Sequence, residues 1–327
     1  MGKAIHAAVD PYVLLLLGTV VIASLLPCGG TTAVAFHMLA TAAITLLFFL
    51  HGAKLARSAI VAGFLHWRLH AVVLAVTFVL FPLLGLAFSR VPGLAPPVAA
   101  GLLFLTLLPS TVQSSIAFTS IAGGNVSAAV CSASFSNLAG IVVTPILVAT
   151  LMGAAARSSG AFASAEGIAL QLLLPFVLGH LLRPLIGGFV SRHKTLVTTV
   201  DRGSILLVVY TAFSAAVVEG FWRSTSIADL LVIIALCSAI LAIVLVATDL
   251  VGALFGFALE DRIVLRFCGS KKSLASGVPM AGVLFPAALV GPIILPLMIF
   301  HQIQLIVCAI LARRYADRSA AVACLPE

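Results

Sequence analysis

Long apolar stretches separated by short polar ones run through the whole chain. Ten of them occur, at about 10–27, 33–53, 69–88, 97–122, 125–151, 164–187, 202–222, 227–257, 262–284 and 287–312. Each is close to or above the roughly 20 residues that an α-helix needs to cross the hydrocarbon core of a bilayer. The pattern therefore predicts an all-α membrane protein with ten transmembrane helices.

The composition supports a membrane protein and argues against two other classes. Of the 327 residues, 62% are hydrophobic and 9% are charged, whereas a soluble domain is about 25% charged. The net charge of +8 does not indicate a nucleic-acid partner, because the basic residues lie in short stretches between apolar segments. The six cysteines form no CxxC pair and have no histidine at metal-ligand spacing. We therefore expect no nucleic acid and no resident cofactor.

The distribution of Lys and Arg predicts an orientation. With ten spans, 13 basic residues fall on the side of the N-terminus and three, Arg90, Arg157 and Arg223, fall on the other. Because basic residues concentrate in cytoplasmic loops, both termini are predicted in the cytoplasm, with the protein in the cytoplasmic (inner) membrane. A cleaved signal peptide is the alternative for the first stretch. The proline in Leu25-Leu26-Pro27-Cys28 fits a cleavage site poorly, so an uncleaved helix is favoured.

Two segments far apart in the chain resemble each other. The segment 97–122 carries the run Pro109–Thr119, and 262–284 carries FCGSKKSLASGVPMAG over 267–282. Each is rich in helix-breaking or hydroxyl residues, and each precedes a long span with an internal proline, Pro145 and Pro296. The chain thus divides into repeats of five helices, about 10–151 and 164–312. Since five is odd, the repeats are inverted, and broken helices four and nine point to a transporter binding site.

Lys271 and Lys272 lie at the centre of the second broken segment. A charge at mid-bilayer costs roughly 3 kcal/mol on insertion scales, so we expect the pair to face water, a counter-charge or a substrate. There they would bind an anionic substrate, or replace a coupling cation and exchange a proton. The alternative is that they belong to the cytoplasmic loop with Arg262 and Arg266 and extend outward.

Other polar residues of these segments are candidate ligands for a substrate or an ion. They share hydroxyl, amide or imidazole groups within apolar stretches, and they are Gln113, Ser114, Ser115, Thr119, Ser134, Asn137, Ser270, Ser273, Ser276, His301 and Gln304. The alternative is that the serines line helix contacts and the histidine is a packed core residue. Asp249 is an acid within an apolar segment, and we expect Lys271 or Lys272 to be its partner, in a functional or a structural ion pair.

Four motifs together resemble a known family. They are Pro109–Thr119, Ser134–Asn137, the lysine-containing run from Phe267, and LPLMIFHQIQ over 295–304. They are similar to the bile acid:sodium symporter family, and more closely to its SBF-like branch. The resemblance implies the inverted five-plus-five repeat. A panel domain (10–53 and 164–222) would face a core domain (69–151 and 227–312), with helices four and nine crossing at their breaks.

The resemblance also implies where a coupling ion would lie. In sodium-coupled members the ions are held near the crossing by hydroxyl, amide, carbonyl and carboxylate oxygens. By position, Ser115 stands where an asparagine occurs and Thr119 matches a threonine, so these two residues are the candidate sodium ligands. The family's carboxylate falls near Ser270, where this chain has no acid. That departure counts against sodium coupling.

These observations favour a secondary active, symporter-like transporter of a small organic anion. It would work by alternating access in the lipid bilayer, coupled to sodium or protons, and it would not be an enzyme. No oligomeric state is predicted. One alternative is a non-transporting membrane regulator of ion or lipid homeostasis. Another is an intramembrane hydrolase that uses Ser273 or Ser276 with a neutral lysine, for which the sequence offers no recognisable oxyanion device.

Overall fold

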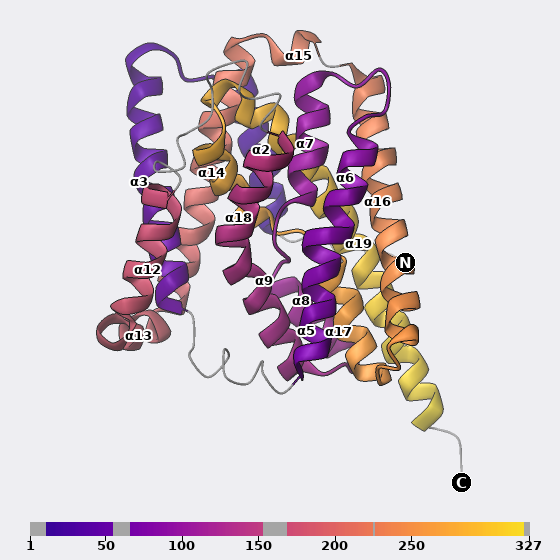
Figure 1. The fold of residues 1–327 in the computed structure, drawn as a ribbon. Helices are drawn as coiled ribbons and strands as arrows, with labels where there is room; N and C mark the ends of the chain where they lie inside the picture. The colour runs from indigo at the N-terminus through magenta and orange to yellow at the C-terminus, as the bar shows by residue number, and fades with distance from the viewer. Residues whose placement is uncertain (1–10, 55–65, 153–168, 225, 324–327) are drawn as a thin grey trace.

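The chain folds into helices joined by short connections (Figure 1). The computed structural model describes residues 11–54, 66–152, 169–224 and 226–323, and no strand occurs among them. The helices are α2 (Pro11–Leu25), α3 (Gly30–Lys54), α5 (Trp67–Ala75), η2 (Val76–Leu80), α6 (Phe81–Phe88), α7 (Pro96–Thr106), α8 (Gln113–Ile121), α9 (Val126–Leu147), η3 (Val148–Met152), η4 (Ala169–Leu173), α12 (Leu174–Leu181), α13 (Arg183–Arg192), α14 (Lys194–Val218), α15 (Phe221–Ser224), α16 (Ile227–Leu254), α17 (Leu259–Gly269), α18 (Leu274–Leu284) and α19 (Ala287–Ala323). The predicted all-α class is confirmed.

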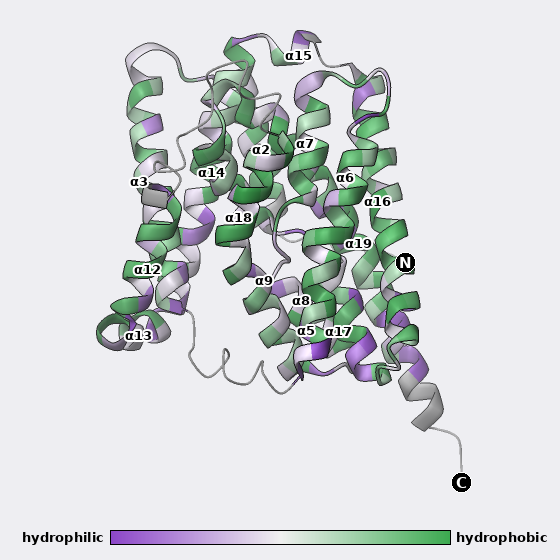
Figure 2. Ribbon diagram, viewed as in Figure 1, coloured by the Kyte–Doolittle hydropathy of each residue, from purple (hydrophilic) through white to green (hydrophobic). Residues whose placement is uncertain are grey.

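Several of these helices are long and apolar enough to cross a membrane. Within the described residues there are six such spans, or seven if α12 and α13 count as one bent span. The six are Gly30–Lys54, Trp67–Phe88, Val126–Met152, Lys194–Val218, Ile227–Leu254 and Ala287–Arg318. Hydrophobic residues cover the middles of the helices, and hydrophilic residues gather near their ends (Figure 2). The molecule is a multi-pass membrane protein.

The structure divides several of the ten predicted segments. The segment 97–122 is interrupted at 107–112, and 262–284 is interrupted at 270–273, so neither half is long enough to span alone. The segment 164–187 bends by 90° between α12 and α13, where Pro184 lies in the first turn of α13 and has no amide hydrogen to continue α12. Residue 10, residues 164–168, and Lys3, Arg57 and Arg157 of the charge count lie outside the described residues.

Polar residues at the ends of apolar runs determine where several helices begin. The hydroxyl of Ser226 accepts from the Asp229 amide at 3.1 Å, and the Asp229 carboxylate accepts from the Ser226 amide at 2.7 Å, which forms a capping box before α16. Asn125 caps α9 by accepting from the Ala128 amide at 3.0 Å. It follows Gly123, whose φ of +72° makes the tight turn between α8 and α9.

For description we divide the helices into two groups, which are also packed against each other, since α14 contacts α19 as extensively as it contacts α2 and α3. In the first group α3 packs against α12, α13 and α14, while α2 packs against α14. Two glycines permit the close contact of α3 with α12: a Cβ on Gly52 would lie 2.0 Å from the Phe176 carbonyl, and one on Gly179 would lie 1.9 Å from the Phe49 carbonyl. The second group contains α5–α9 and α16–α19. The groups meet where α14 contacts α18 and α19 and where α3 contacts α18.

Candidate functional site

The breaks in the two interrupted helices lie against each other. Residues 107–112 separate α7 from α8, and residues 270–273 separate α17 from α18. The Ser273 amide donates to the Pro109 carbonyl at 2.8 Å, so the backbones of the two breaks are directly joined. Proline at 109 has no amide hydrogen, which accounts for part of the first interruption. The two broken segments singled out by the sequence therefore meet in a single crossing, which comprises 107–112 and 270–273.

Side chains of α9 satisfy backbone groups that the first break leaves unpaired. Ser136 accepts from the Ser110 amide at 2.9 Å, and Thr144 donates to the Leu107 carbonyl at 2.7 Å. All three polar residues are buried. Buried backbone groups without partners are costly, so these bonds stabilise an irregular backbone at the centre of the helical bundle.

Gln304 of α19 does the same for the second break. Its Oε1 accepts from the Lys272 amide at 2.9 Å, and its Nε2 donates to the Lys272 carbonyl at 3.0 Å. The same Nε2 lies 2.8 Å from Nδ1 of His301. His301 and Gln304, three residues apart, thus lie on one face of α19, and Gln304 holds the backbone of the crossing.

Both lysines of the crossing are buried, with 0% of each residue exposed to solvent. The alternative that they extend outward with the loop arginines is wrong. Lys272 Nζ donates to three backbone carbonyls, those of Thr77, Thr106 and Leu108, at 2.8, 2.8 and 2.7 Å. Lys271 Nζ lies 4.0 Å from the centre of the Phe118 ring and has no hydrogen-bond partner in the part of the chain that the structure describes.

Asp249 does not pair with either lysine. Its carboxylate forms an ion pair with Arg266 instead, so the expected partner was wrong. The connection between α16 and α17 is short, so the two helices run antiparallel and pack against each other. Residues that lie equally far along the chain before and after the connection therefore face each other. Asp249 and Arg266 occupy such positions, and the Arg266 guanidinium also donates to the Tyr315 hydroxyl.

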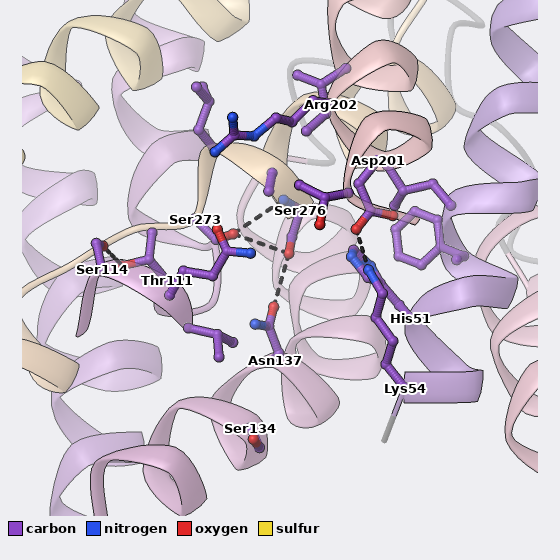
Figure 3. Close-up of a pocket in the computed structure, with 18 of the residues that line it drawn as sticks. His51, Lys54, Thr111, Ser114, Ser134, Asn137, Asp201, Arg202, Ser273 and Ser276 are labelled. Carbon is purple, nitrogen blue, oxygen red and sulfur yellow. Dashed lines mark hydrogen bonds and ion pairs between the residues drawn. The ribbon is translucent and has the colours of Figure 1, made fainter. Parts of the chain in front are cut away.

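A cavity of about 370 Å³ lies beside the crossing, between the two helix groups (Figure 3). From α8, α9, α18 and α19 it is lined by sequence-predicted site residues: Gln113, Ser114, Ser134, Asn137, Ser273, Ser276 and His301. Ser276 donates to Asn137 Oδ1 at 2.8 Å, and the Ser273 hydroxyl donates to that of Ser276 at 3.1 Å. The structure thus brings residues of both broken segments and of α9 to one wall of this cavity. We call the cavity the central cavity, and the wall formed by the seven residues above the crossing wall.

The remaining predicted residues lie behind this wall. Lys271, Lys272, Ser115, Thr119, Ser270 and Gln304 are not among the residues that line the cavity. The Ser115 hydroxyl donates to the Phe267 carbonyl at 2.9 Å, and that of Ser270 donates to the Arg266 carbonyl at 2.6 Å. The buried Thr119 hydroxyl has no partner among the described residues. In the same described part, no cluster of three or more His, Cys, Asp or Glu side chains could hold a metal ion.

The opposite wall contains titratable residues that the sequence pattern did not single out. They are His51 and Lys54 at the end of α3 and Asp201 and Arg202 in α14, with Tyr12 of α2 beside them. Lys54 and Asp201 form an ion pair (Figure 3). Cζ of Arg202 lies 5.0 Å from the centre of the Tyr12 ring. Sequence reasoning had counted Lys54 and Arg202 only as loop charges that set the orientation. The available signal in the sequence was an acidic and a basic residue, Asp201 and Arg202, directly next to an apolar helical segment.

Comparison with protein-family models places nearly the whole chain in one family. Residues 10–317 match the model of the SBF-like CPA transporter family. The chain belongs to that family. SBF-like CPA transporters carry solutes across membranes, so the protein is a transporter and not an enzyme, and the hydrolase alternative is set aside.

Relatives of the SBF-like CPA transporter family match along most of their length. The chain is 56% identical over 311 residues to the Pseudomonas aeruginosa protein PA2026, which covers 94% of this chain and 93% of that one. It is 54% identical over 308 residues to "Putative symporter YfeH" of Escherichia coli K12, with 94% and 92% covered. Sodium/bile acid cotransporter 7 of Xenopus tropicalis is 28% identical over 280 residues, with 82% and 80% covered.

Proposed function

We propose that this protein is a secondary active transporter that moves a small organic anion across the cytoplasmic membrane by alternating access. The observation that carries the proposal is the central cavity. Two half-helix N-termini and two cationic side chains, those of Lys54 and Arg202, meet at this cavity, which lies between the two helix groups.

The crossing wall favours an anion because of the direction of its half-helices. α8 begins at Gln113 and α18 at Leu274, and both first turns line the cavity. The N-terminus of a helix carries a partial positive charge and unpaired amide groups, which together attract anions. Hydroxyl and amide groups of Ser114, Ser276 and Asn137 lie close to these termini as further hydrogen-bonding groups. We place the anionic group of the substrate between the two first turns.

The opposite wall adds positive charge. Its charged side chains comprise two cations, Lys54 and Arg202, and one carboxylate, Asp201. Lys54 and Asp201 neutralise each other, so Arg202 supplies the excess positive charge. A guanidinium binds carboxylate, phosphate or sulfate groups through paired hydrogen bonds. Arg202 is therefore our choice for the residue that meets the substrate from this side.

The apolar part of the lining suits a substrate with a hydrophobic body. Leu47 and Phe48 of α3, Phe176 of α12 and Leu138 and Ile141 of α9 all line the cavity. Binding sites for small organic molecules are mostly apolar, with a few polar groups that fix orientation. An anion with a hydrocarbon body would satisfy both parts of this surface.

The mechanism uses the two helix groups as the moving parts. In the proposed arrangement the helices within 10–53 and 164–222 form the panel, and those within 69–151 and 227–312 form the core, in ten spans arranged as inverted repeats with both termini cytoplasmic. Rocking of the panel on the core would expose the cavity to one side of the membrane and then to the other. The gradient of Na⁺ or H⁺ would drive the cycle, with Ser115 and Thr119 as the proposed sodium ligands.

Uptake into proteoliposomes tests the proposal. Wild-type protein is expected to accumulate one class of organic anion when an Na⁺ or H⁺ gradient is imposed, and to lose accumulation when that gradient is collapsed. Arg202→Gln should lower uptake at least about tenfold, the equivalent of about 1.4 kcal/mol. Arg192→Gln at the exposed end of α13 is the matched control. Equal uptake by both variants would remove Arg202 from the site, and no uptake of any organic anion would refute the proposed function.

A further inference from the structure

Three backbone carbonyls in the second helix group have no partner within their own helices. The first belongs to Thr77 in the π-helical turn η2. The Phe81 amide donates to the Val76 carbonyl in that turn, and the next residue, Pro82, has no amide hydrogen. A π-turn pairs a carbonyl with the fifth residue along, which for Thr77 is this proline. The sequence therefore leaves the Thr77 carbonyl open.

The other two carbonyls belong to the end of α7 and the first break. Thr106 is the last residue of α7, and Leu108 lies in the break. The final carbonyls of a helix lack amide partners and carry partial negative charge. The Ser110 amide, which would pair with Thr106 in a continued helix, donates to the Ser136 hydroxyl instead. Two separate interruptions thus direct three open carbonyls to one point.

The Lys272 ammonium occupies that point. Its Nζ lies 2.8, 2.8 and 2.7 Å from the oxygens of Thr77, Thr106 and Leu108, and 4.1 Å from the centre of the Phe81 ring. A charged lysine has three N–H donors, one for each carbonyl, whereas a neutral amine has two. The carbonyl geometry therefore fits the charged form. The ring face is a further attractive surface for a cation.

No carboxylate takes part in this arrangement. The ion pairs in the described ranges join Lys54 to Asp201 and Arg266 to Asp249, and neither involves Lys272. The cation is held by uncharged backbone oxygens alone. In potassium channels, rings of backbone carbonyls replace the hydration shell of a monovalent metal ion.

We propose that the Lys272 ammonium is a resident cation that fills a monovalent-cation site at the crossing. The site is built from the carbonyls of Thr77, Thr106 and Leu108. Because the cation is part of the chain, this position takes no ion from solution while the ammonium occupies it. The consequence for transport, that no ion moves through this position, rests on the proposed function. The existence of the site does not.

Lys271 provides a matched contrast on the adjacent residue. Both side chains are fully buried, but Lys271 Nζ has no hydrogen-bond acceptor among the described residues. Removal of its ammonium leaves no set of carbonyls open. Any effect that follows from burial alone should appear in both variants, whereas an effect of the carbonyl site should appear only at position 272.

The experiment is a cation titration of Lys272→Ala, with Lys271→Ala and wild type as controls. Melting temperatures of the purified full chain are measured in detergent with Na⁺, K⁺ or NH₄⁺ against N-methyl-D-glucamine, at constant ionic strength. Removing the lysine opens the site, so a small cation should raise the melting temperature of Lys272→Ala saturably, by about 3 °C or more. The two controls should respond equally to all four cations.

Two results would overturn the proposal. One is a Lys272→Ala protein that melts at the same temperature in every cation, and the other is an equal gain in Lys271→Ala. If Lys272→Ala folds in none of the salts, Lys272→Gln replaces it, and absence of the cation effect there overturns the proposal as well. No substrate is present, so the result is independent of the uptake assay. Even if the protein transports no organic anion, the cation dependence of the melting temperature still supports or overturns the cation site.

Discussion

Replacing Gln304 should destabilise the crossing more than any nearby polar substitution in α19. Gln304 is fully buried, and its amide pairs with both the N–H and the C=O of Lys272. Gln304→Met keeps a side chain of similar length but can make neither bond. The backbone N–H and C=O of Lys272 would then both be unpaired, because residues in the break make no helical hydrogen bonds.

The magnitude follows from the number of groups left unpaired. A buried donor or acceptor that loses its partner costs about 1–3 kcal/mol, so two groups give a loss of about 2–6 kcal/mol. Met is more apolar than Gln, and its favourable burial offsets part of this. We therefore expect the lower half of the range, about 2–4 kcal/mol, as the net loss of free energy of unfolding.

Equilibrium unfolding in mixed detergent micelles measures this difference. Gln302→Met is the matched control, because Gln302 is the same residue type two positions away, is half-buried and has no such contact with the crossing. It should change the free energy of unfolding by less than about 0.5 kcal/mol. If Gln304→Met and Gln302→Met are equally stable, the bonds of Gln304 do not support the break, and the reasoning fails.

Three further predictions concern other contacts. Gly179→Ala should prevent the close packing of α3 on α12 and lower the melting temperature, whereas Gly203→Ala, with nothing within 4 Å of the added Cβ, should leave it unchanged or raise it; equal melting temperatures would contradict this. Asp249→Asn leaves the half-buried Arg266 without its ion pair, so it should cost roughly 1–3 kcal/mol of stability, and stability equal to wild type in the unfolding assay would show that the pair contributes nothing. Lys54→Gln frees a carboxylate in the cavity, so it should raise KM for the transported anion severalfold with little change in melting temperature, and an unchanged KM in concentration-dependent uptake would place the anion elsewhere.

The broken helices could be predicted because their cause is local. Proline at 109 removes an amide donor and glycine at 269 lowers the local preference for helix. The lysines between apolar runs needed a buried set of partners. Which partners these would be could not be predicted. The carbonyls of Thr77 and Thr106 come from helices more than 160 residues away in the chain, and only the packing of those helices brings them to Lys272.

The charged wall of the central cavity was missed for a different reason. Helix α14 begins at Lys194, eight residues before the apolar run predicted from 202, and Thr198 and Asp201 in this polar stretch line the cavity. A hydropathy pattern assigns such residues to a loop. The orientation count therefore includes Arg202 as a loop charge and passes over Asp201, although both lie on a helix and line the cavity opposite the crossing wall. By contrast, the partner of Asp249 was within reach of the sequence, because a short connection forces α16 and α17 to run antiparallel.

The central claim is that the transported anion passes through the cavity between the crossing wall and Arg202. Ala275 lines this cavity on α18 and has a small side chain. The most direct measurement is uptake of the transported anion by Ala275→Cys in proteoliposomes, before and after reaction with a bulky thiol reagent. The account predicts that the variant transports, that labelling abolishes uptake, and that excess substrate slows the labelling. Full uptake by completely labelled protein would show that the anion takes another route.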